Sequence, residues 1–431
     1  MSKPARASRL KERVAAGLKR RYRRERGFEL AGLGALLVGL LFLAFFFFTL
    51  IGDGYKAFRQ TVILLDIELP VAEFEVEGLS PQEALEQADY LVMVRDALRA
   101  RFPEVTERGP LRELFALVSI SSSFALRDRV LADPSLVGGS IGLPVFADDD
   151  VDMLIKGNLD RDAPVTGRRL TDQQLGWIEV LEAEGRVELA FNKGFFTQGD
   201  SRDPEMAGIW GASVGSFYML LVTLVLSFPL GVAAAIYLEE FAPRNRWTDF
   251  IEVNINNLAA VPSVIFGLLG LALFINWFGL PRSAPLVGGL VLTLMTLPVV
   301  IISARAALTS VPPSIREAAM GVGASKMQII THHVLPLAMP GMLTGTIIGM
   351  ARALGESAPL LMIGMVAFIV DTPASPLDPA TALPVQIYLW ADSPERAFVE
   401  RTSAAILMLL LFLLLMNASA ILLRRHFERR W

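Results

Sequence analysis

The sequence has no cysteine among its 431 residues and only three histidines. Without cysteine there is no disulfide, no thiolate metal site and no cysteine nucleophile. His332, His333 and His426 form no H-E-x-x-H pattern or other cluster of zinc ligands. No lysine follows a glycine, which excludes a phosphate-binding loop of the G-x-x-x-x-G-K-[ST] type. We therefore expect no catalytic residue, no metal site and no cofactor bound by this chain.

Apolar residues, in contrast, are abundant. They make up 53% of the sequence, and the mean hydropathy is +0.47, which is too apolar for an ordinary soluble enzyme. Several apolar runs are long enough to cross a bilayer, so we expect an all-α polytopic membrane protein. The six predicted transmembrane segments are, approximately, 28–51, 211–238, 254–278, 285–304, 337–368 and 403–423.

Basic residues predict how these segments are oriented. Residues 1–27 carry eleven Lys and Arg against two acidic residues, and basic residues also mark the central loop 305–336 and the tail 425–431. Because basic loops stay in the cytoplasm, we expect both termini on the cytoplasmic side of the membrane. A basic arm is also found in nucleic-acid-binding proteins. The adjoining apolar segment favours topology and contact with anionic lipid instead, so no nucleic acid is expected as a partner.

Residues 52–209 differ in composition from the rest of the chain. They contain 29 Asp and Glu against 16 Lys and Arg, which predicts an extracytoplasmic (periplasmic) domain inserted before the transmembrane region 210–424. Its pattern is that of an α+β domain. The expected strand regions are 61–79, with a proline interruption at Pro70, and 186–192. The expected helices are one opened by the capping box Ser80-Pro81-Gln82-Glu83, then 110–131 and 171–184.

An acidic run, Asp148-Asp149-Asp150 followed by Asp152, lies within this domain. Carboxylate oxygens are suitable ligands for a divalent cation. The run lacks the spacing and the turn glycine of a calcium-binding loop, which favours a solvated loop. The domain shows no catalytic constellation, and its role stays open.

A moderately polar stretch, Glu317–Pro336, separates two apolar runs and must therefore surface on one side of the membrane. It predicts a short helix, a sharp turn at a glycine and a second short helix stopped by a proline. The alternative is an ordinary loop between two transmembrane helices. The residues that define the pattern are Glu317, Ala318, Ala319, Gly323, Leu335 and Pro336.

This spacing resembles the E-A-A signature of permease subunits of ABC importers, with His333 departing from it at an apolar position. The resemblance implies that the loop docks onto a separate cytoplasmic ATPase, with Glu317 near the contact and Gly323 making the turn. ATP and magnesium would then bind to that partner and not to this chain.

Small residues repeat at every fourth position after the loop. Gly341, Gly345 and Gly349 place a smooth stripe on one helix face, where another helix can approach closely. The neighbouring helix can belong to this chain or to another subunit, and the sequence leaves both possibilities open.

Two ionisable residues, Arg352 and Glu356, follow inside a predicted transmembrane segment. Charged side chains in a membrane require pairing or access to water. Their i, i+4 spacing puts them on one helical face, within reach of each other. They are either a self-neutralised structural pair or part of a pathway in which the arginine meets an anion, because a guanidinium suits the oxygens of phosphate or sulfate.

Further stretches resemble the phosphate branch of these importers, the PstA family of permeases. They are Trp210–Ser216, Pro229–Phe241, Ala259–Leu268, Ala351–Leu360 and Leu383–Tyr388. Ile302-Ser303-Ala304-Arg305 departs from the charged pattern expected there, and short members lack residues 52–209.

The resemblance implies a MetI-like fold of six transmembrane helices that forms half of the pathway for inorganic phosphate, with Arg352 and Glu356 in the pathway. Its implied partners are a second permease subunit (PstC-like), an ATPase dimer (PstB-like), a periplasmic phosphate-binding protein (PstS-like) and membrane lipid. Two alternatives remain: a permease for another oxyanion such as sulfate, molybdate or phosphonate, and a membrane-anchored phosphate-sensing or interaction protein.

Overall fold

The computed structural model describes residues 3–75, 80–162, 164, 169–366 and 368–427. The chain divides into two compact units, residues 1–53 and 54–431. The first unit is almost entirely helix α1 (Lys3–Gly54), which runs without a break from the basic tail through the predicted first transmembrane segment. No proline follows Pro4 in this stretch, so nothing interrupts the backbone hydrogen bonds of the helix.

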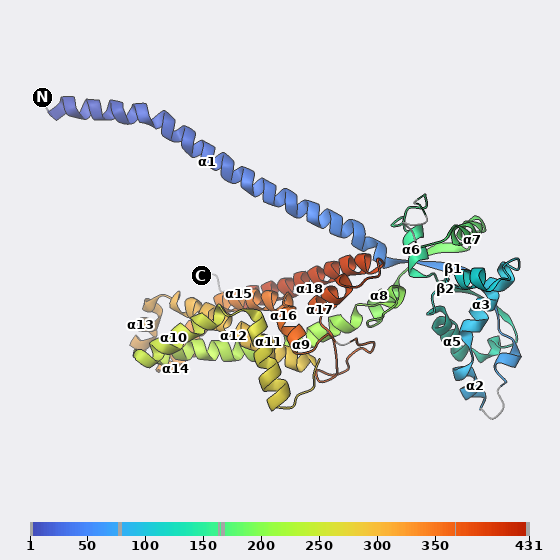
Figure 1. The fold of residues 1–431 in the computed structure, drawn as a ribbon. Helices are drawn as coiled ribbons and strands as arrows, with labels where there is room; N and C mark the ends of the chain where they lie inside the picture. Colours follow the sequence, from blue (N-terminus) through green and yellow to red (C-terminus); the bar gives the residue numbers. More distant parts are fainter. Residues whose placement is uncertain (1–2, 76–79, 163, 165–168, 367, 428–431) are drawn as a thin grey trace. The chain divides into compact units, whose positions relative to one another are not determined.

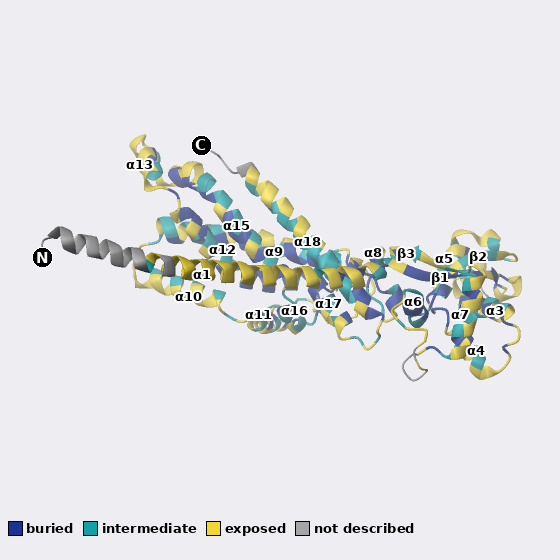
Figure 2. Ribbon diagram, turned by 90° about the horizontal axis from the view of Figure 1, so that it is seen from above, coloured by how far each residue is buried: buried dark blue, intermediate teal, exposed yellow. Residues whose placement is uncertain are grey.

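The second unit begins with the insert, which we define as residues 55–209. Its sheet has three antiparallel strands in the order β2-β1-β3. The central strand β1 (Arg59–Glu68) buries Ile63, Leu65 and Ile67, and Figure 2 shows it as a buried strand within the insert. The outer strands are β2 (Ser140–Phe146) and β3 (Val187–Phe191).

Seven short helices surround this sheet. Two of them begin with a capping box, in which Ser80 pairs with Glu83 and Thr171 pairs with Gln174. The capped start predicted at Ser80 is thus confirmed. The helices of the insert are α2 (Pro81–Gln87), α3 (Tyr90–Arg101), α4 (Arg108–Phe115), α5 (Ser122–Ala132), α6 (Asp149–Ile155), α7 (Asp172–Ala183) and α8 (Lys193–Thr197).

Two element predictions for the insert were too long. Strand β1 ends at Glu68, just before the interruption expected at Pro70, which cannot donate to a strand ladder. Beyond Pro70 no strand follows among the described residues up to 75, where Val71–Glu73 form a 3-10 turn, and 76–79 lie outside the described residues. The single helix expected over 110–131 is two helices, α4 and α5. Between them the chain joins the sheet edge, where Ser119 N donates to Phe146 O at 3.0 Å.

The remainder of the second unit is helical. Three helices are continued by π-helical segments, at Tyr237–Phe241, Leu271–Trp277 and Ile329–Val334. The helices are α9 (Trp210–Ile236), α10 (Arg246–Ala259), α11 (Ser263–Gly270), α12 (Pro285–Thr309), α13 (Pro313–Gly321), α14 (Lys326–Gln328), α15 (Leu335–Leu354), α16 (Ala358–Met362), α17 (Leu383–Ala391) and α18 (Phe398–Phe427).

Five helices among the described residues are long and apolar enough to cross a membrane, and a bent pair makes a sixth candidate. The predicted segment 254–278 is this pair, Arg246–Ala259 and Ser263–Trp277, which meet at 102°. The prediction of one continuous helix is therefore wrong. The reason lies at Pro262, because a proline restricts the residue before it to extended conformations.

The predicted segment 337–368 was also too long. Its helix α15 ends at Leu354, with Gly355 as the C-cap residue, and only the short helix α16 follows before residue 368. The prediction continued past Gly355, where the helix stops, because the stretches on both sides of Gly355 are largely apolar.

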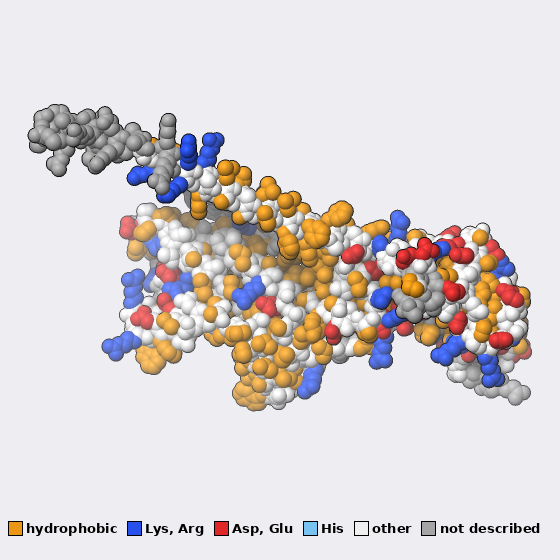
Figure 3. Space-filling model, turned by 45° about the horizontal axis from the view of Figure 1, so that its top comes forward, with side chains coloured by type: hydrophobic (Ala, Val, Ile, Leu, Met, Phe, Trp, Pro, Cys, Tyr) orange, Lys and Arg blue, Asp and Glu red, His pale blue; other side chains and the backbone are white. Residues whose placement is uncertain are grey.

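Helix α12 lies at the centre of the permease part. It packs against α9 on one side and α15 on another, and Val291, Leu292 and Val300 are fully buried (Figure 1). Figure 3 shows apolar side chains over the permease helices and acidic side chains gathered over the insert. The two parts thus present different surfaces to their surroundings.

Candidate functional site

The coupling segment, which we define as residues 313–334, consists of α13, α14 and the π-helical residues Ile329–Val334. Gly323 has a φ of +84° just beyond the end of α13, and Ala324 N donates to Ala319 O at 3.1 Å. This left-handed position favours glycine. The expected glycine turn after the first short helix is confirmed.

Two basic side chains hold the coupling segment against the rest of the permease. Arg316 donates to Glu240 Oε1 through Nη2 at 2.9 Å and also to the backbone oxygens of Val311 and Leu308. Lys326 lies over the ring of Phe241, 4.9 Å from its centroid. Ala319 is buried at the base of the segment.

The outer face of the coupling segment is exposed and partly apolar. Met320, Val322 and Met327 are 57%, 83% and 60% exposed, and Glu317 and Ala318 are exposed beside them. Apolar side chains clustered on a surface are typical of a contact site for another protein. The segment combines a base attached to the permease helices with an outer face that is largely exposed.

The proline at the end of the signature does not stop a helix. Leu335 and Pro336 form the first turn of α15, and the chain is helical from Lys326 to Leu354. The prediction that Pro336 ends the second short helix is wrong. The π-helical turn just before it changes the hydrogen-bond pattern, and the first turn of a helix tolerates a residue without an N–H. His333 lies exposed in that turn.

The glycine stripe of α15 faces α12 of the same chain. A Cβ atom at Gly345 would lie 2.0 Å from Ser303 Oγ, and one at Gly341 would lie 2.8 Å from the Ala307 Cβ atom. At Gly349 the nearest atom is in Thr296, at 3.2 Å. The sequence left open whether the neighbouring helix belongs to this chain or to another subunit. In the structure it belongs to this chain.

Arg352 and Glu356 form an ion pair, with Nε and Oε1 3.6 Å apart. Arg352 lies in the last turn of α15, while Glu356 follows the C-cap residue Gly355. The prediction that both lie on one face of a transmembrane helix is wrong, because the helix ends between them. The Arg352 side chain is 48% exposed and that of Glu356 is 20% exposed, so the guanidinium is open to a ligand or to solvent.

A second set of charged side chains, the loop-end pairs, lies near the coupling segment and was missed in the sequence. Arg305 of α12 lies 2.9 Å from Glu252 and 3.4 Å from Glu239, and Arg316 pairs with Glu240. All five side chains are partly exposed. The sequence did contain a signal for these pairs: two adjacent acidic residues, Glu239 and Glu240, and basic residues on the central loop.

A third set, the insert joint, connects the insert to the start of α18. Lys156, the C-cap residue of α6, lies between Asp152 and Glu400, 2.9 Å from the Glu400 Oε1 atom, and these side chains are at most 5% exposed. Glu400 also accepts from Asn158, and Arg401 is buried with its guanidinium 5.8 Å from the Phe195 ring centroid. Sequence reasoning missed this set, because its members are 244 residues apart.

The acidic run is not a solvated loop, contrary to the prediction. Asp148 caps helix α6 by accepting from Asp150 N at 3.3 Å, while Asp152 belongs to the insert joint. Burial, and next the charge of Asp149, raise the pKa of Asp148 to about 8. Burial raises the pKa of Asp150 as well. Carboxyl oxygens of Asp148, Asp149 and Asp150 lie within 4.8 Å of one another.

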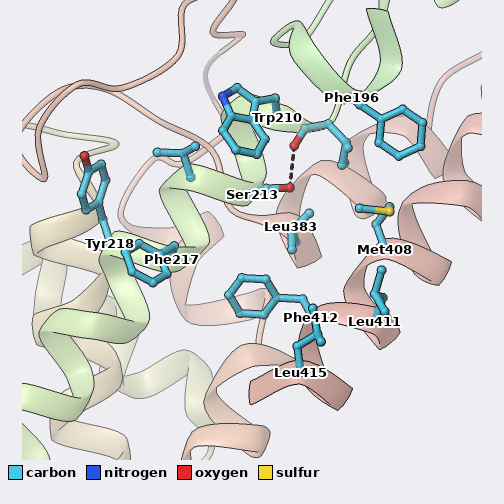
Figure 4. A pocket seen from close by; sticks show the side chains of 12 residues that line it. Phe196, Trp210, Ser213, Phe217, Tyr218, Leu383, Met408, Leu411, Phe412 and Leu415 are labelled. Atoms are coloured by element: carbon cyan, nitrogen blue, oxygen red, sulfur yellow. Dashed lines mark hydrogen bonds between the residues drawn. The ribbon is translucent and has the colours of Figure 1, made fainter. Parts of the chain in front are cut away.

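An apolar groove of about 480 Å³ lies between α9 and α18, bordered by α8 and α17 (Figure 4). Its lining includes Phe217, Phe412 and Leu415, and the Ser213 hydroxyl is already bonded to Ile209 O. The groove has no charged lining residue, so it is unsuited to bind an anion. It is therefore not a candidate for the path of a charged solute.

Comparisons with known proteins agree with these features. The family model "Binding-protein-dependent transport system inner membrane component" matches residues 227–431, and "Domain of unknown function (DUF3333)" matches 15–165. The "Phosphate transport system permease protein PstA 1" of Mycobacterium tuberculosis (strain H37Rv) is 33% identical over 217 residues, which are 50% of this chain and 70% of that protein. The chain belongs to the PstA family of ABC importer permeases.

Other members show similar identity. PstA of Haemophilus influenzae is 31% identical over 46% of this chain and 69% of its own length. The "Probable ABC transporter permease protein YqgI" of Bacillus subtilis is 34% identical over 43% of this chain and 63% of that protein. Among solved structures, a chain of an inward-facing MetNI methionine ABC transporter is similar to this protein. The match covers 52% of this chain and 95% of that chain, with 21% identity and a TM-score of 0.41.

As a PstA-family permease, the protein is a multi-pass membrane component of an ABC importer and not itself an enzyme. The predicted fold class, an all-α MetI-like permease with an inserted α+β domain, is confirmed. The matches to these PstA relatives cover about half of the chain, and the family model that matches residues 15–165 describes a domain of unknown function.

Proposed function

We propose that this PstA-family chain forms half of the transmembrane pathway of an ATP-driven importer of inorganic phosphate, and that its coupling segment receives force from a separate ATPase. The observation that carries the coupling proposal is the exposed face of the segment, with Met320, Val322 and Met327 around Glu317, on a base held by Arg316. The segment must stay attached to the helices behind it if a push on the face is to move them. The π-helical residues 329–334 join the segment directly to α15.

Phosphate is the proposed substrate on two grounds. Several relatives are named phosphate transport permeases, and Arg352 presents a half-exposed guanidinium held by Glu356. The planar fork of a guanidinium matches two oxygens of a tetrahedral anion. YqgI is named only as a probable ABC transporter permease, so it supports the transport class and not the solute.

The remaining parts of the transporter come from other chains. We propose a PstC-like permease as the second half of the pathway, a PstB-like ATPase dimer that holds ATP and magnesium, and a PstS-like periplasmic binding protein that delivers phosphate. The chain itself binds no cofactor in this proposal. Its orientation places the coupling segment and both termini in the cytoplasm of a bacterial cell, with the insert outside the inner membrane, as the basic residues near the termini favour.

The direct test measures labelled phosphate uptake in a strain that lacks only this chain, with and without the chain restored. We expect uptake to require the chain, and excess unlabelled sulfate, molybdate or phosphonate to leave it unchanged. Competition by one of these anions at the same concentration as phosphate would assign the permease to another oxyanion. Uptake that is independent of the chain would refute a transport role.

The pathway residue is tested with Arg352→Gln. We expect this variant to assemble with its partners and to lose phosphate uptake, since the guanidinium is replaced by a neutral amide. Arg99→Gln is the control, because Arg99 is an exposed residue of α3 in the insert. Wild-type uptake by Arg352→Gln would exclude Arg352 from the pathway.

A further inference from the structure

The insert contains a hollow of about 550 Å³ that has no part in the proposed transport path. Helices α3 and α4 form one wall, and the residues before α6 and around Pro204–Met206 form the other. A volume of this size is in the range of sites for small organic molecules. The two walls carry charges of opposite sign.

The first wall carries three arginines. Arg108 and Arg112 lie one helical turn apart on α4, and Arg95 of α3 lies over the Phe115 ring, 5.6 Å from its centroid. Among the described residues no carboxylate lies within 4.0 Å of these three guanidinium groups, whereas Arg101 and Arg186 of the insert both have acidic partners. Three neighbouring cations repel one another until an anion lies between them.

The opposite wall consists of Asp148, Asp203 and Glu205. Burial raises the pKa of Asp148 to about 8 and also raises the pKa of Glu205, whose carboxyl group accepts a hydrogen bond from the Ser119 hydroxyl. Both groups are thereby shifted toward their neutral, proton-bearing form. A hydroxyl group both donates and accepts hydrogen bonds, so it can pair with a carboxyl group in either protonation state, and this wall is suited to the hydroxyl groups of a ligand.

The space between the walls is apolar. Leu111, Phe115, Val118 and Ile120 line it, and Ile120 is 59% exposed. An inorganic anion would leave this surface and most of the volume unfilled. A ligand with a short carbon skeleton would cover it while its charged end remains at the arginines.

From this arrangement we infer that the hollow is a binding site for a phosphate monoester of a small polyol, with the phosphate on Arg95, Arg108 and Arg112 and the hydroxyl-bearing skeleton toward Asp148 and Glu205. A doubly charged phosphate with three free oxygens suits three guanidinium forks better than a single carboxylate does. The site is separate from Arg352, and the inference does not depend on phosphate transport.

Binding is measured by titration calorimetry on the purified full-length chain in lipid nanodiscs, in phosphate-free buffer of constant ionic strength. The probes are glycerol 3-phosphate, inorganic phosphate and glycerol. We expect saturable binding of glycerol 3-phosphate, about ten-fold weaker binding of inorganic phosphate and none of glycerol. Equal affinity for the first two probes would overturn the monoester assignment, and no saturable binding of either would overturn the site.

Variants locate the site. The double variant Arg108→Gln, Arg112→Gln should lower the affinity for glycerol 3-phosphate at least about ten-fold. Arg99→Gln, on the exposed side of α3 and outside the hollow, should leave it unchanged. Unchanged affinity in the double variant, or an equal loss in Arg99→Gln, would refute the assignment.

A milder variant tests whether the double variant loses binding only because it fails to fold. Arg112→Lys keeps the charge and the helix but removes the planar fork. It should weaken binding several-fold while the melting temperature stays at the wild-type value. Unchanged binding in this variant would contradict the role of the guanidinium groups.

Discussion

Charged side chains fix the permease helices at two places, and they do so in different ways. In the insert joint, Lys156, Asp152 and Glu400 are at most 5% exposed, so each charge depends on the others. In the loop-end pairs, the Arg305 and Arg316 side chains are 25% and 22% exposed, and water remains available to them. A buried network tolerates no missing member, whereas partly exposed pairs contribute little individually.

This difference separates a permanent connection from an adjustable one. The insert joint ties α6 to the first turn of α18 through side chains that must leave water together. The loop-end pairs, which include Arg316, hold the coupling segment through contacts that water can replace at a small cost in free energy. Such contacts suit a segment that must change its surroundings during a transport cycle, and each prediction below tests one side of the comparison.

The largest effect is expected from Lys156→Met. This change leaves Asp152 and Glu400 as two buried carboxylates without their cation, which should destabilise the insert by about 3–5 kcal/mol. The measurement is the thermal or urea unfolding of the purified chain. Arg101→Met, which removes an ion pair with the partly exposed Glu184, is the control and should change the stability by less than about 1 kcal/mol. Similar losses in both variants would remove the distinction between the two kinds of pair.

The next effect concerns the turn of the coupling segment. Gly323→Val places a β-branched residue at a φ of +84°, which costs about 1–2 kcal/mol locally and should distort the turn. We expect phosphate uptake to fall about ten-fold while the assembled transporter still hydrolyses ATP. A ten-fold lower rate corresponds to a barrier that is higher by about 1.4 kcal/mol.

The matched control for this variant is Gly321→Ala. A Cβ atom there would meet no heavy atom within 4 Å, so both uptake and ATP hydrolysis should stay at the wild-type level. Wild-type uptake in Gly323→Val would rule out the coupling role of the turn.

Counted per pH unit, the effect of pH on the insert is expected to be no larger than that of Gly323→Val. The pKa of Asp148 is raised from 3.8 to about 8, so the folded insert binds a proton that the unfolded chain has released at neutral pH. Stability should therefore be greatest below pH 4 with respect to this group and fall as the pH rises toward 8, by at most about 1.4 kcal/mol per pH unit. Asp148→Asn, which keeps an N-cap side chain, should make the unfolding midpoint less dependent on pH between 6 and 8. An unchanged slope in this variant would show that other groups cause the dependence.

The smallest effect is expected from Glu252→Gln in the loop-end pairs. Arg305 keeps Glu239 at 3.4 Å after this change, so the loss of stability should be below about 1 kcal/mol. Unfolding of the purified chain measures it under the same conditions as Lys156→Met. A loss as large as that of Lys156→Met would mean that the loop end is as dependent on its charges as the insert joint.

Local chemistry was readable from the sequence where one short stretch decides the outcome. Ser80 and Glu83 predicted a helix start because both partners of the capping box are three residues apart. The turn at Gly323 was predictable for the same reason, since a left-handed residue after a helix is most often glycine. The family signature indicated, by resemblance only, which surface would contact a separate ATPase.

Features that depend on distant parts of the chain were not readable. Nothing near Lys156 indicates that Glu400 will reach it, because folding brings the insert and α18 together. The bend at Pro262 was visible as a proline, but the apolarity of the residues on both sides favoured one straight helix. Burial in the insert joint likewise depends on packing and not on the acidic composition of the run around Asp152.

The closest contact between two transmembrane helices has a consequence for how the permease can open. At Gly345 the backbone of α15 approaches Ser303 of α12 so nearly that no side-chain atom fits between them. Interlocked surfaces of this kind resist both separation and sliding. We therefore expect helices α12 and α15 to move together in the proposed transport cycle, so that the opening for the solute forms along their other borders.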